Sequence, residues 1–146
     1  MSGEVVVTLT RADKYKFLID FGSGMPAVAA DLGRPLGEGS GPSPEHLLAA
    51  AIGNCLSASL VFALQRYKED PGPLSARVAV TTGRNADKRL RVASMAVTLT
   101  VGDAAANLPH LAEALARFEE FCTVTQSVRA GIPIEVKVVG PDGTAL

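Results

Sequence analysis

The sequence predicts one mixed α+β domain over residues 1–146. Three observations lead to this prediction: short alternating segments near the N-terminus, one long apolar helical segment in the middle, and two longer alternating segments after it. A chain of 146 residues can bury one proper core but is short for two domains. The predicted order is β-β-(β)-α-β-β-α-α-β, which is not the strict alternation of a doubly wound parallel sheet.

The N-terminal part predicts a hairpin followed by a long loop. Alternating apolar residues indicate strands over 5–10 and 15–21, with a polar turn at residues 11–13. Residues 22–44 are rich in Gly, Pro and Ser and contain at most one short strand, near 27–30. Long irregular segments in compact domains are often functional, so this connection is a candidate part of a site.

Residues 43–67 predict a helix that is apolar on every face. Ser43 is a good N-cap, Pro44 suits the first helical position, and Glu45 complements the helix dipole. No further charged residue follows until Arg66. A helix that is apolar all round is a buried one, and some 24 residues would span roughly 36 Å. Because this is too long for a monomer of this size to cover, we expect a second subunit to cover part of the helix.

Five further elements complete the predicted order: strands at 75–82 and 92–101, helices at 108–121 and 122–131, and a strand at 132–139. A basic polar loop joins the first two of these strands, and Gly131 is the predicted C-cap of the second helix.

Composition and charge narrow the class of protein. A content of 47% hydrophobic and 20% charged residues is typical of a folded globular chain. A net charge of −1 without a basic stripe gives no reason to expect nucleic-acid binding. We find no run of about 18 apolar residues that predicts a membrane span, and no signal peptide pattern. We therefore expect a soluble cytoplasmic protein.

The chain has two cysteines, Cys55 and Cys122. In a reducing compartment they stay free, and as small buried hydrophobes they could serve packing alone. The histidines, His46 and His110, form no close ligand pair with either cysteine, so no metal site is expected. Packing and redox chemistry therefore remain the two interpretations of the pair.

Cys55 has no charged residue within nine positions before it or ten after it. Because burial alone would make the thiol inert, a reactive Cys55 needs a cation supplied by tertiary structure. Arg34 is the best placed candidate, and Glu45 could orient its guanidinium by a bidentate pair. The plain alternatives are a solvated loop arginine and an ordinary first-turn glutamate.

Cys122 directly follows two glutamates and a phenylalanine, and nearby carboxylates disfavour a thiolate, whereas the start of a helix favours it. This context suits a second, resolving thiol better than a first nucleophile. In such a scheme Cys55 attacks a peroxide and becomes a sulfenic acid, Cys122 condenses with it to a disulfide, and an external thiol restores both.

Helix geometry limits what Glu45 can do for Cys55. Ten residues separate them, which is about 15 Å along a helix and about 80° around it. A glutamate side chain does not cover that distance. If Glu45 serves a Cys55 pocket, either the helix is broken near Gly53 or the glutamate serves the partner subunit's cysteine.

Residues 41–57, GPSPEHLLAAAIGNCLS, resemble the glutamate-to-cysteine helix of the OsmC/Ohr family, the osmotically inducible and organic hydroperoxide resistance proteins. Pro44, Glu45 and Cys55 reproduce its proline-glutamate start and its cysteine ten residues later. Residues 122–126, CTVTQ, resemble the second family motif: a cysteine, a valine two residues on and then a serine or threonine. The order of elements agrees along nearly the whole chain.

The resemblance implies an OsmC-like fold of antiparallel sheets with a long buried central helix, in an intertwined homodimer with its active site at the interface. It implies an antioxidant, thiol-dependent peroxidase for organic or inorganic hydroperoxides that needs an external thiol or dithiol and no metal or haem. Cys55 would be peroxidatic and Cys122 resolving, with Glu45 and an arginine in support. That arginine would be Arg34 by the OsmC pattern or Arg11 by the Ohr pattern.

A different function on the same fold is also open. The chain could be a non-catalytic binding or redox-sensing protein, with Leu48, Ile52 and Phe62 lining a groove for a small apolar ligand.

Overall fold

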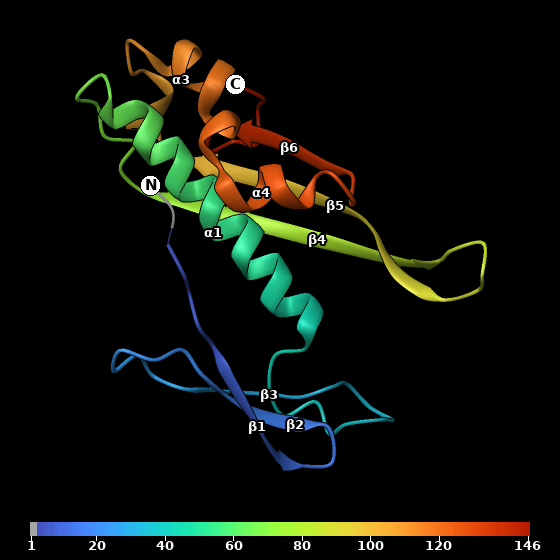
Figure 1. Ribbon diagram of the computed structural model, residues 1–146. Coiled ribbons are helices and arrows are strands. Elements are labelled where there is room, and N and C mark those ends of the chain that lie inside the picture. Colours follow the sequence, from blue (N-terminus) through green and yellow to red (C-terminus); the bar gives the residue numbers. More distant parts are fainter. Residues whose placement is uncertain (1–2) are drawn as a thin grey trace. The chain divides into compact units, whose positions relative to one another are not determined.

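The structure is a computed structural model that describes residues 3–146 (Figure 1). Strands and helices follow one another in a mixed α+β order, as predicted. The chain divides into two compact units, one ending at Leu48 and one from Ala49 to Leu146. The single domain over residues 1–146 stays a prediction, and each unit is described by itself.

The first unit contains a three-stranded antiparallel sheet in the order β1-β2-β3, formed by β1 (Thr8–Asp13), β2 (Lys16–Asp20) and β3 (Val28–Ala30). The turn predicted at residues 11–13 is wrong. Arg11 pairs with Phe17 inside the ladder, and a bulge lets the strand continue to Asp13. Lys14 makes the turn instead with a φ of 42°, and its carbonyl accepts a 2.8 Å hydrogen bond from Arg11 Nε.

The helix α1 (Pro44–Gln65) begins as predicted, and the side chain of Ser43 caps its first turn. The Ser43 hydroxyl accepts a hydrogen bond from the backbone N–H of His46 at 3.3 Å. In return, Nδ1 of His46 accepts from the backbone N–H of Ser43 at 3.1 Å, so a histidine takes the part that glutamate usually has in a capping box. The helix runs unbroken through Gly53, which excludes the break considered above.

By length and composition alone, α1 is long and apolar enough to cross a bilayer. In the second unit it is nevertheless a core helix. Its buried residues are Ile52, Gly53, Leu56, Ser59, Leu60, Ala63 and Leu64. Several apolar residues of α1 stay exposed in the single chain: Ala50, Ala51, Ala58 and Phe62.

The sheet of the second unit combines β4 (Leu74–Arg84), β5 (Leu90–Val101) and β6 (Ile134–Val139). β4 and β5 are antiparallel as predicted, but β6 pairs parallel to β5, so this sheet is mixed. The intervening helical segment provides the long crossover that a parallel pair requires. The register aligns Val78, Val97 and Val136 across the three strands. A Cβ on Gly53 would lie 2.9 Å from Cγ2 of Val78, so α1 packs closely on β4.

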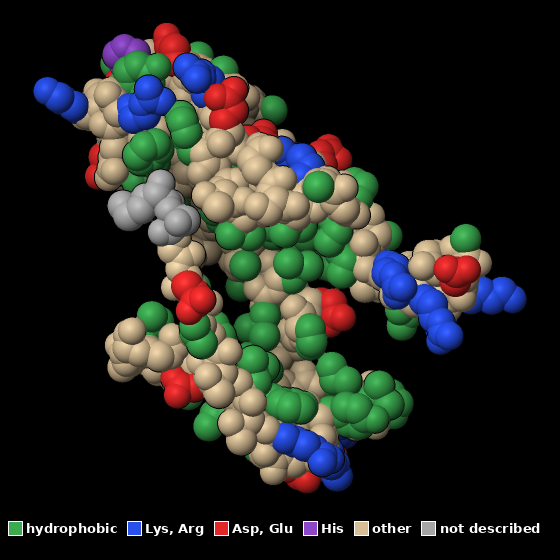
Figure 2. Space-filling view, in the orientation of Figure 1, with side chains coloured by type: hydrophobic (Ala, Val, Ile, Leu, Met, Phe, Trp, Pro, Cys, Tyr) green, Lys and Arg blue, Asp and Glu red, His purple; other side chains and the backbone are tan. Residues whose placement is uncertain are grey.

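The β4–β5 hairpin is longer than predicted, because the strands extend to Arg84 and from Leu90. Asn85 closes its end: the side-chain oxygen accepts hydrogen bonds from the backbone N–H groups of Asp87 and Arg89, both at 3.0 Å. Figure 2 shows Lys and Arg side chains gathered at this end of the hairpin.

Between β5 and β6 the chain forms α2 (Asp103–Ala106), α3 (Leu111–Arg117), the 3₁₀ helix η1 (Phe118–Phe121) and α4 (Thr123–Val128). The single helix predicted over residues 108–121 is therefore wrong. The first turn of the predicted helix, before Leu111, is not helical. There Glu69 Oε1 accepts a hydrogen bond from the backbone N–H of His110 at 3.2 Å and lies 2.6 Å from Nδ1 of the same residue.

The second predicted helix exists but ends earlier than expected. Arg129 is the C-cap of α4 and has right-handed helical dihedrals. Gly131 is not among the glycines with positive φ, so it does not form the predicted left-handed cap.

Candidate active site

The two cysteines, 67 positions apart in sequence, meet in the second unit. Cys55 lies in the middle of α1, and Cys122 lies at the junction of η1 and α4. Their side chains are close enough for Cys55 to add to the effect of burial in raising the pKa of the Cys122 thiol. Both thiols are free. This is the arrangement that a thiol–disulfide cycle requires.

The two thiols differ in exposure. Cys122 is fully buried, whereas Cys55 is partly exposed. Loss of hydration on burial is the largest cause that raises the pKa of Cys122, followed by the neighbouring Cys55. An outside molecule can thus reach Cys55 more readily than Cys122, and burial disfavours the thiolate of Cys122.

The preceding glutamates are not the cause that the sequence suggested. Glu119 Oε1 is 2.7 Å from the guanidinium of Arg129, and Glu120 pairs with Arg117 at 3.4 Å. Neither carboxylate contributes to the shift of the Cys122 pKa. The pKa of Cys122 is raised, as expected, but the main cause is burial rather than the negative charge of the glutamates.

Cys122 is also the N-cap of α4. The backbone N–H of Thr125 donates to Cys122 Sγ at 3.4 Å, and the Cys122 thiol donates to the Thr125 hydroxyl at 2.9 Å. Thr125 is fully buried. As donors to the ionised sulfur, the backbone N–H and the hydroxyl of Thr125 lower the pKa of Cys122 and partly offset the effect of burial.

A frame of hydrogen bonds fixes the turn that carries Cys122. The carbonyl of Glu119 accepts from the Cys122 backbone N–H at 3.1 Å and from Gln126 Nε2 at 3.0 Å. The Arg129 guanidinium bonds both the Glu119 carboxylate, at 2.7 Å, and the carbonyl of Ile134, at 3.1 Å. The η1–α4 turn is therefore tied to the start of β6.

Cys55 opens into an apolar pocket of about 360 Å³. Its lining residues are Cys55, Ala58, Ser59, Phe62 and Phe121. The four on α1 recur at helical spacing and so share one face. The Ser59 hydroxyl donates to the carbonyl of Cys55 at 2.8 Å, so its proton is already used in a hydrogen bond within the helix. The pocket thus presents mainly carbon surface beside the thiol.

Two aromatic rings form the outer wall of this pocket. Phe62 and Phe121 meet edge to face, with centroids 5.2 Å apart, and the guanidinium carbon of Arg66 lies 5.2 Å from the centroid of Phe121. Of the three residues predicted to line a groove, Phe62 does so. Ile52 is instead fully buried core, and Leu48 is not among the lining residues.

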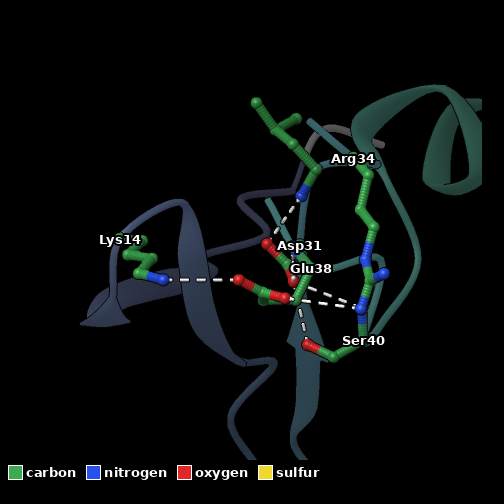
Figure 3. Close-up of polar contacts among 6 residues, drawn as sticks. Lys14, Asp31, Arg34, Glu38 and Ser40 are labelled. Atoms are coloured by element: carbon green, nitrogen blue, oxygen red, sulfur yellow. Dashed lines mark hydrogen bonds and ion pairs between the residues drawn. The ribbon is translucent and has the colours of Figure 1, made fainter. Parts of the chain in front are cut away.

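The predicted arginine and glutamate lie in the first unit. Arg34 is largely exposed and pairs with Glu38 at 3.6 Å, and Glu38 also pairs with Lys14 at 3.3 Å (Figure 3). Glu45 is exposed in the first turn of α1. The structure thus brings Cys55 and Cys122 together, while the roles of Arg34, Arg11 and Glu45 stay predictions.

The loop that carries Arg34 is organised by Asp31. This buried carboxylate accepts hydrogen bonds from the backbone N–H groups of Leu32 at 2.8 Å, Glu38 at 3.1 Å and Ser40 at 3.2 Å, and from the Ser40 hydroxyl at 2.8 Å (Figure 3). These bonds hold the pKa of Asp31 below its usual value, with the bond from the Ser40 backbone N–H contributing most to the shift. Arg34 is therefore presented from a well-ordered loop.

Sequence reasoning missed Arg66 and Phe121, and it gave no role to Thr125, the threonine of the second motif. Thr125 carried a signal, because it lies three positions after Cys122, the spacing of an N-cap and its partner. The other two depend on packing between α1 and η1 and left no local pattern. Among residues 3–146, no group of three or more His, Cys, Asp or Glu side chains could hold a metal ion.

Comparison with known proteins supports the fold. Solved structures with the same fold include an OsmC-like protein of unknown function from Vibrio cholerae (TM-score 0.78, 15% identity, covering 94% of this chain and 100% of that one). Another is an OsmC-like protein from Mycoplasma pneumoniae (TM-score 0.77, 14% identity, covering 96% and 99%). A third is the organic hydroperoxide resistance protein OhrB of Bacillus subtilis (TM-score 0.66, 19% identity, covering 93% and 98%).

No curated protein matches the chain. At the identities above, the solved structures establish the fold alone. The family model described as OsmC-like protein, however, matches residues 37–137, which is most of the chain and includes both cysteines. On this match, together with the paired thiols and the shared fold, the chain belongs to the OsmC-like protein family.

Proposed function

We propose that this protein is a cytoplasmic thiol peroxidase that reduces organic hydroperoxides through a Cys55–Cys122 disulfide cycle. The observation that carries the proposal is the placement of the two thiols. A partly exposed Cys55 faces an apolar pocket, and a buried Cys122 lies against it. Packing alone does not require this pairing of one accessible and one inaccessible thiol.

In the first step the Cys55 thiolate attacks the terminal oxygen of the hydroperoxide. The O–O bond breaks, Cys55 becomes a sulfenic acid, and the departing alkoxide takes a proton and leaves as an alcohol. In the second step Cys122 displaces the hydroxyl from sulfur, giving a disulfide and water. An external dithiol then reduces the disulfide by exchange.

The pocket supports an organic substrate. Its carbon-lined walls and two aromatic rings suit the alkyl or aryl part of a hydroperoxide, with the peroxy group at Cys55. Solved structures of the same fold include organic hydroperoxide resistance proteins from Bacillus subtilis and Elizabethkingia anophelis. Hydrogen peroxide is a further candidate substrate because it needs no pocket.

We assign Arg34 and Glu45 to the support of Cys55 in a homodimer. Because α1 is unbroken, Glu45 lies about 15 Å along the helix from the cysteine of its own chain. A partner chain is therefore the source that we propose for both groups. The exposed apolar surface of α1, including an open groove of about 400 Å³ lined by small side chains of α1 and β4, supports a second copy as its cover.

Peroxidase assays of cysteine variants test this function. Purified reduced protein with a dithiol should consume cumene hydroperoxide rapidly. Cys55→Ser should abolish turnover, whereas Cys122→Ser should retain one rapid turnover and accumulate a sulfenic acid that dimedone traps. Unchanged turnover in Cys55→Ser would contradict the assigned nucleophile. Sedimentation velocity should show a dimer.

The same pocket favours one other function, the binding of a small apolar ligand without turnover. Its volume and its aromatic wall would accommodate such a ligand. In that case the protein would bind a small aromatic probe tightly, and cumene hydroperoxide would persist in the presence of the reduced protein.

A further inference from the structure

Thr125 makes contacts that the proposed cycle does not yet use. It is fully buried on α4, and both its backbone N–H and its hydroxyl are directed at Cys122 Sγ, at 3.4 Å and 2.9 Å. A buried hydroxyl needs a hydrogen-bond partner, and among residues 3–146 the one that Thr125 has through its side chain is the thiol.

The second step of the cycle places a demand on this site. Cys122 must attack as a thiolate, yet burial raises its pKa, so few molecules carry the thiolate at neutral pH. A hydroxyl can both accept and donate. The Thr125 hydroxyl accepts from the neutral thiol in the structure, and by rotating about its C–O bond it can donate to the thiolate instead.

We infer that Thr125 is the positioning residue of the resolving step, holding Cys122 Sγ toward Cys55 and stabilising it as the attacking thiolate with its hydroxyl and backbone N–H. This inference rests on the proposed function. In the step itself, the Cys122 electron pair forms the S–S bond while the S–O bond of the Cys55 sulfenic acid breaks. The hydroxide leaves and takes up a proton to become water, which balances the proton that Cys122 released.

The charged groups near Cys122 do not stabilise its thiolate. The carboxylates of Glu119 and Glu120 are paired with Arg129 and Arg117, and neither contributes to the shift of the Cys122 pKa. On the side of α1, the group that faces Cys122 is Cys55 itself, which opposes the thiolate. Thr125 is therefore the residue that favours the reactive form.

The chain offers a matched set of variants. Thr125→Val keeps the shape and removes the hydroxyl, and Thr125→Ser keeps the hydroxyl. Thr123→Val makes the same chemical change at an exposed position of the same helix. Circular dichroism and the melting temperature report whether each variant is folded.

The experiment follows single turnovers of the full-length reduced protein with one equivalent of cumene hydroperoxide. Dimedone trapping measures the sulfenic acid, and non-reducing mass spectrometry measures the disulfide. We expect Thr125→Val to form the sulfenic acid at the wild-type rate but the disulfide about three- to tenfold more slowly near pH 7. A higher pKa of the Cys122 thiol lowers the fraction of thiolate, and the greater nucleophilicity of each thiolate offsets only part of this loss. Thr125→Ser and Thr123→Val should resemble wild type.

The pH profile separates a chemical role from a merely structural one. Loss of thiolate stabilisation predicts that the deficit of Thr125→Val shrinks as pH rises from about 7 to about 10. In a Cys55→Ser background, thiolate absorbance should show a higher pKa for Cys122 when Thr125 is replaced by Val.

Three results would overturn the inference. Disulfide formation at the wild-type rate in Thr125→Val would do so, and so would a deficit that is equal at every pH or an unchanged Cys122 pKa. Failure of the proposed function looks different, because then wild type itself forms no sulfenic acid, and the inference falls with it.

Discussion

The rings of Phe62 and Phe121 meet edge to face, with centroids 5.2 Å apart and planes at 78°. Phe62 belongs to α1, and Phe121 directly precedes Cys122. This contact ties the helix of one thiol to the turn of the other, and it forms the wall of the pocket beside Cys55. The same pair therefore connects access to Cys55 with the position of Cys122.

Phe62→Ala tests the pocket as the binding site of the organic group. An aromatic ring contributes about 1.5–3 kcal/mol when buried, so kcat/KM for cumene hydroperoxide should fall about tenfold or more. The value for hydrogen peroxide should change little, because it makes no contact with the wall. Leu90→Ala, an exposed apolar truncation in β5, is the control. An equal loss for both peroxides would contradict the assignment.

The raised pKa of Cys122 predicts a loss of stability at alkaline pH. The unfolded thiol loses its proton near its ordinary pKa of about 8.5, whereas the folded thiol keeps it, so the stabilisation is fully present below that pH and declines as pH rises through the folded pKa. Urea unfolding should show wild type losing more stability than Cys122→Ser as pH rises above ~8. Parallel pH dependences would refute the prediction.

Gly53 and Val78 should show strong energetic coupling. Alanine at position 53 gains about 1 kcal/mol of helix propensity, but its Cβ would lie 2.9 Å from Cγ2 of Val78, a stiff β-branched side chain. We expect Gly53→Ala to be more favourable in a Val78→Ala background by about 1–2 kcal/mol, measured by urea unfolding in a double-mutant cycle. If the effects of the two substitutions on the free energy of unfolding were strictly additive, the close contact between α1 and β4 at these residues would carry no energetic penalty.

Asp31→Asn should loosen the loop that carries Arg34. The substitution replaces one acceptor oxygen with an NH₂ group, which would face hydrogen-bond donors and could not accept from them. The melting temperature at neutral pH should therefore fall. Asp20→Asn is the control, because its carboxylate is exposed and accepts a hydrogen bond from the backbone N–H of Gly22 at 2.8 Å.

The effect of Asp31→Asn on stability should depend on pH in the acid range. Because the folded pKa of Asp31 is lowered, the carboxylate contributes stability above its ordinary pKa of about 3.9, and this is lost as pH falls through the lower folded value. The melting temperatures of wild type and Asp31→Asn should therefore converge in strong acid. A constant difference at all pH values would speak against a role for the ionised carboxylate.

Local chemistry in the sequence determined the elements that depend on few neighbours. The N-cap at Ser43, the charge-free run of α1 and the alternation of β4 and β5 were readable because capping and periodicity act over one or two turns. The boundaries that failed depended on distant partners. The start of α3 is set by Glu69, 41 residues before His110, and the parallel pairing of β6 is set by where the crossover returns.

The same division holds at the candidate site. The sequence by itself determined that Cys55 sits in a charge-free helix and that Cys122 begins a helical turn, which is enough to suggest two different thiols. Only the tertiary structure decided that they meet, and that burial, rather than Glu119 and Glu120, raises the pKa of Cys122. Desolvation and contact between α1 and α4 are properties of packing, and no local pattern of residues encodes them.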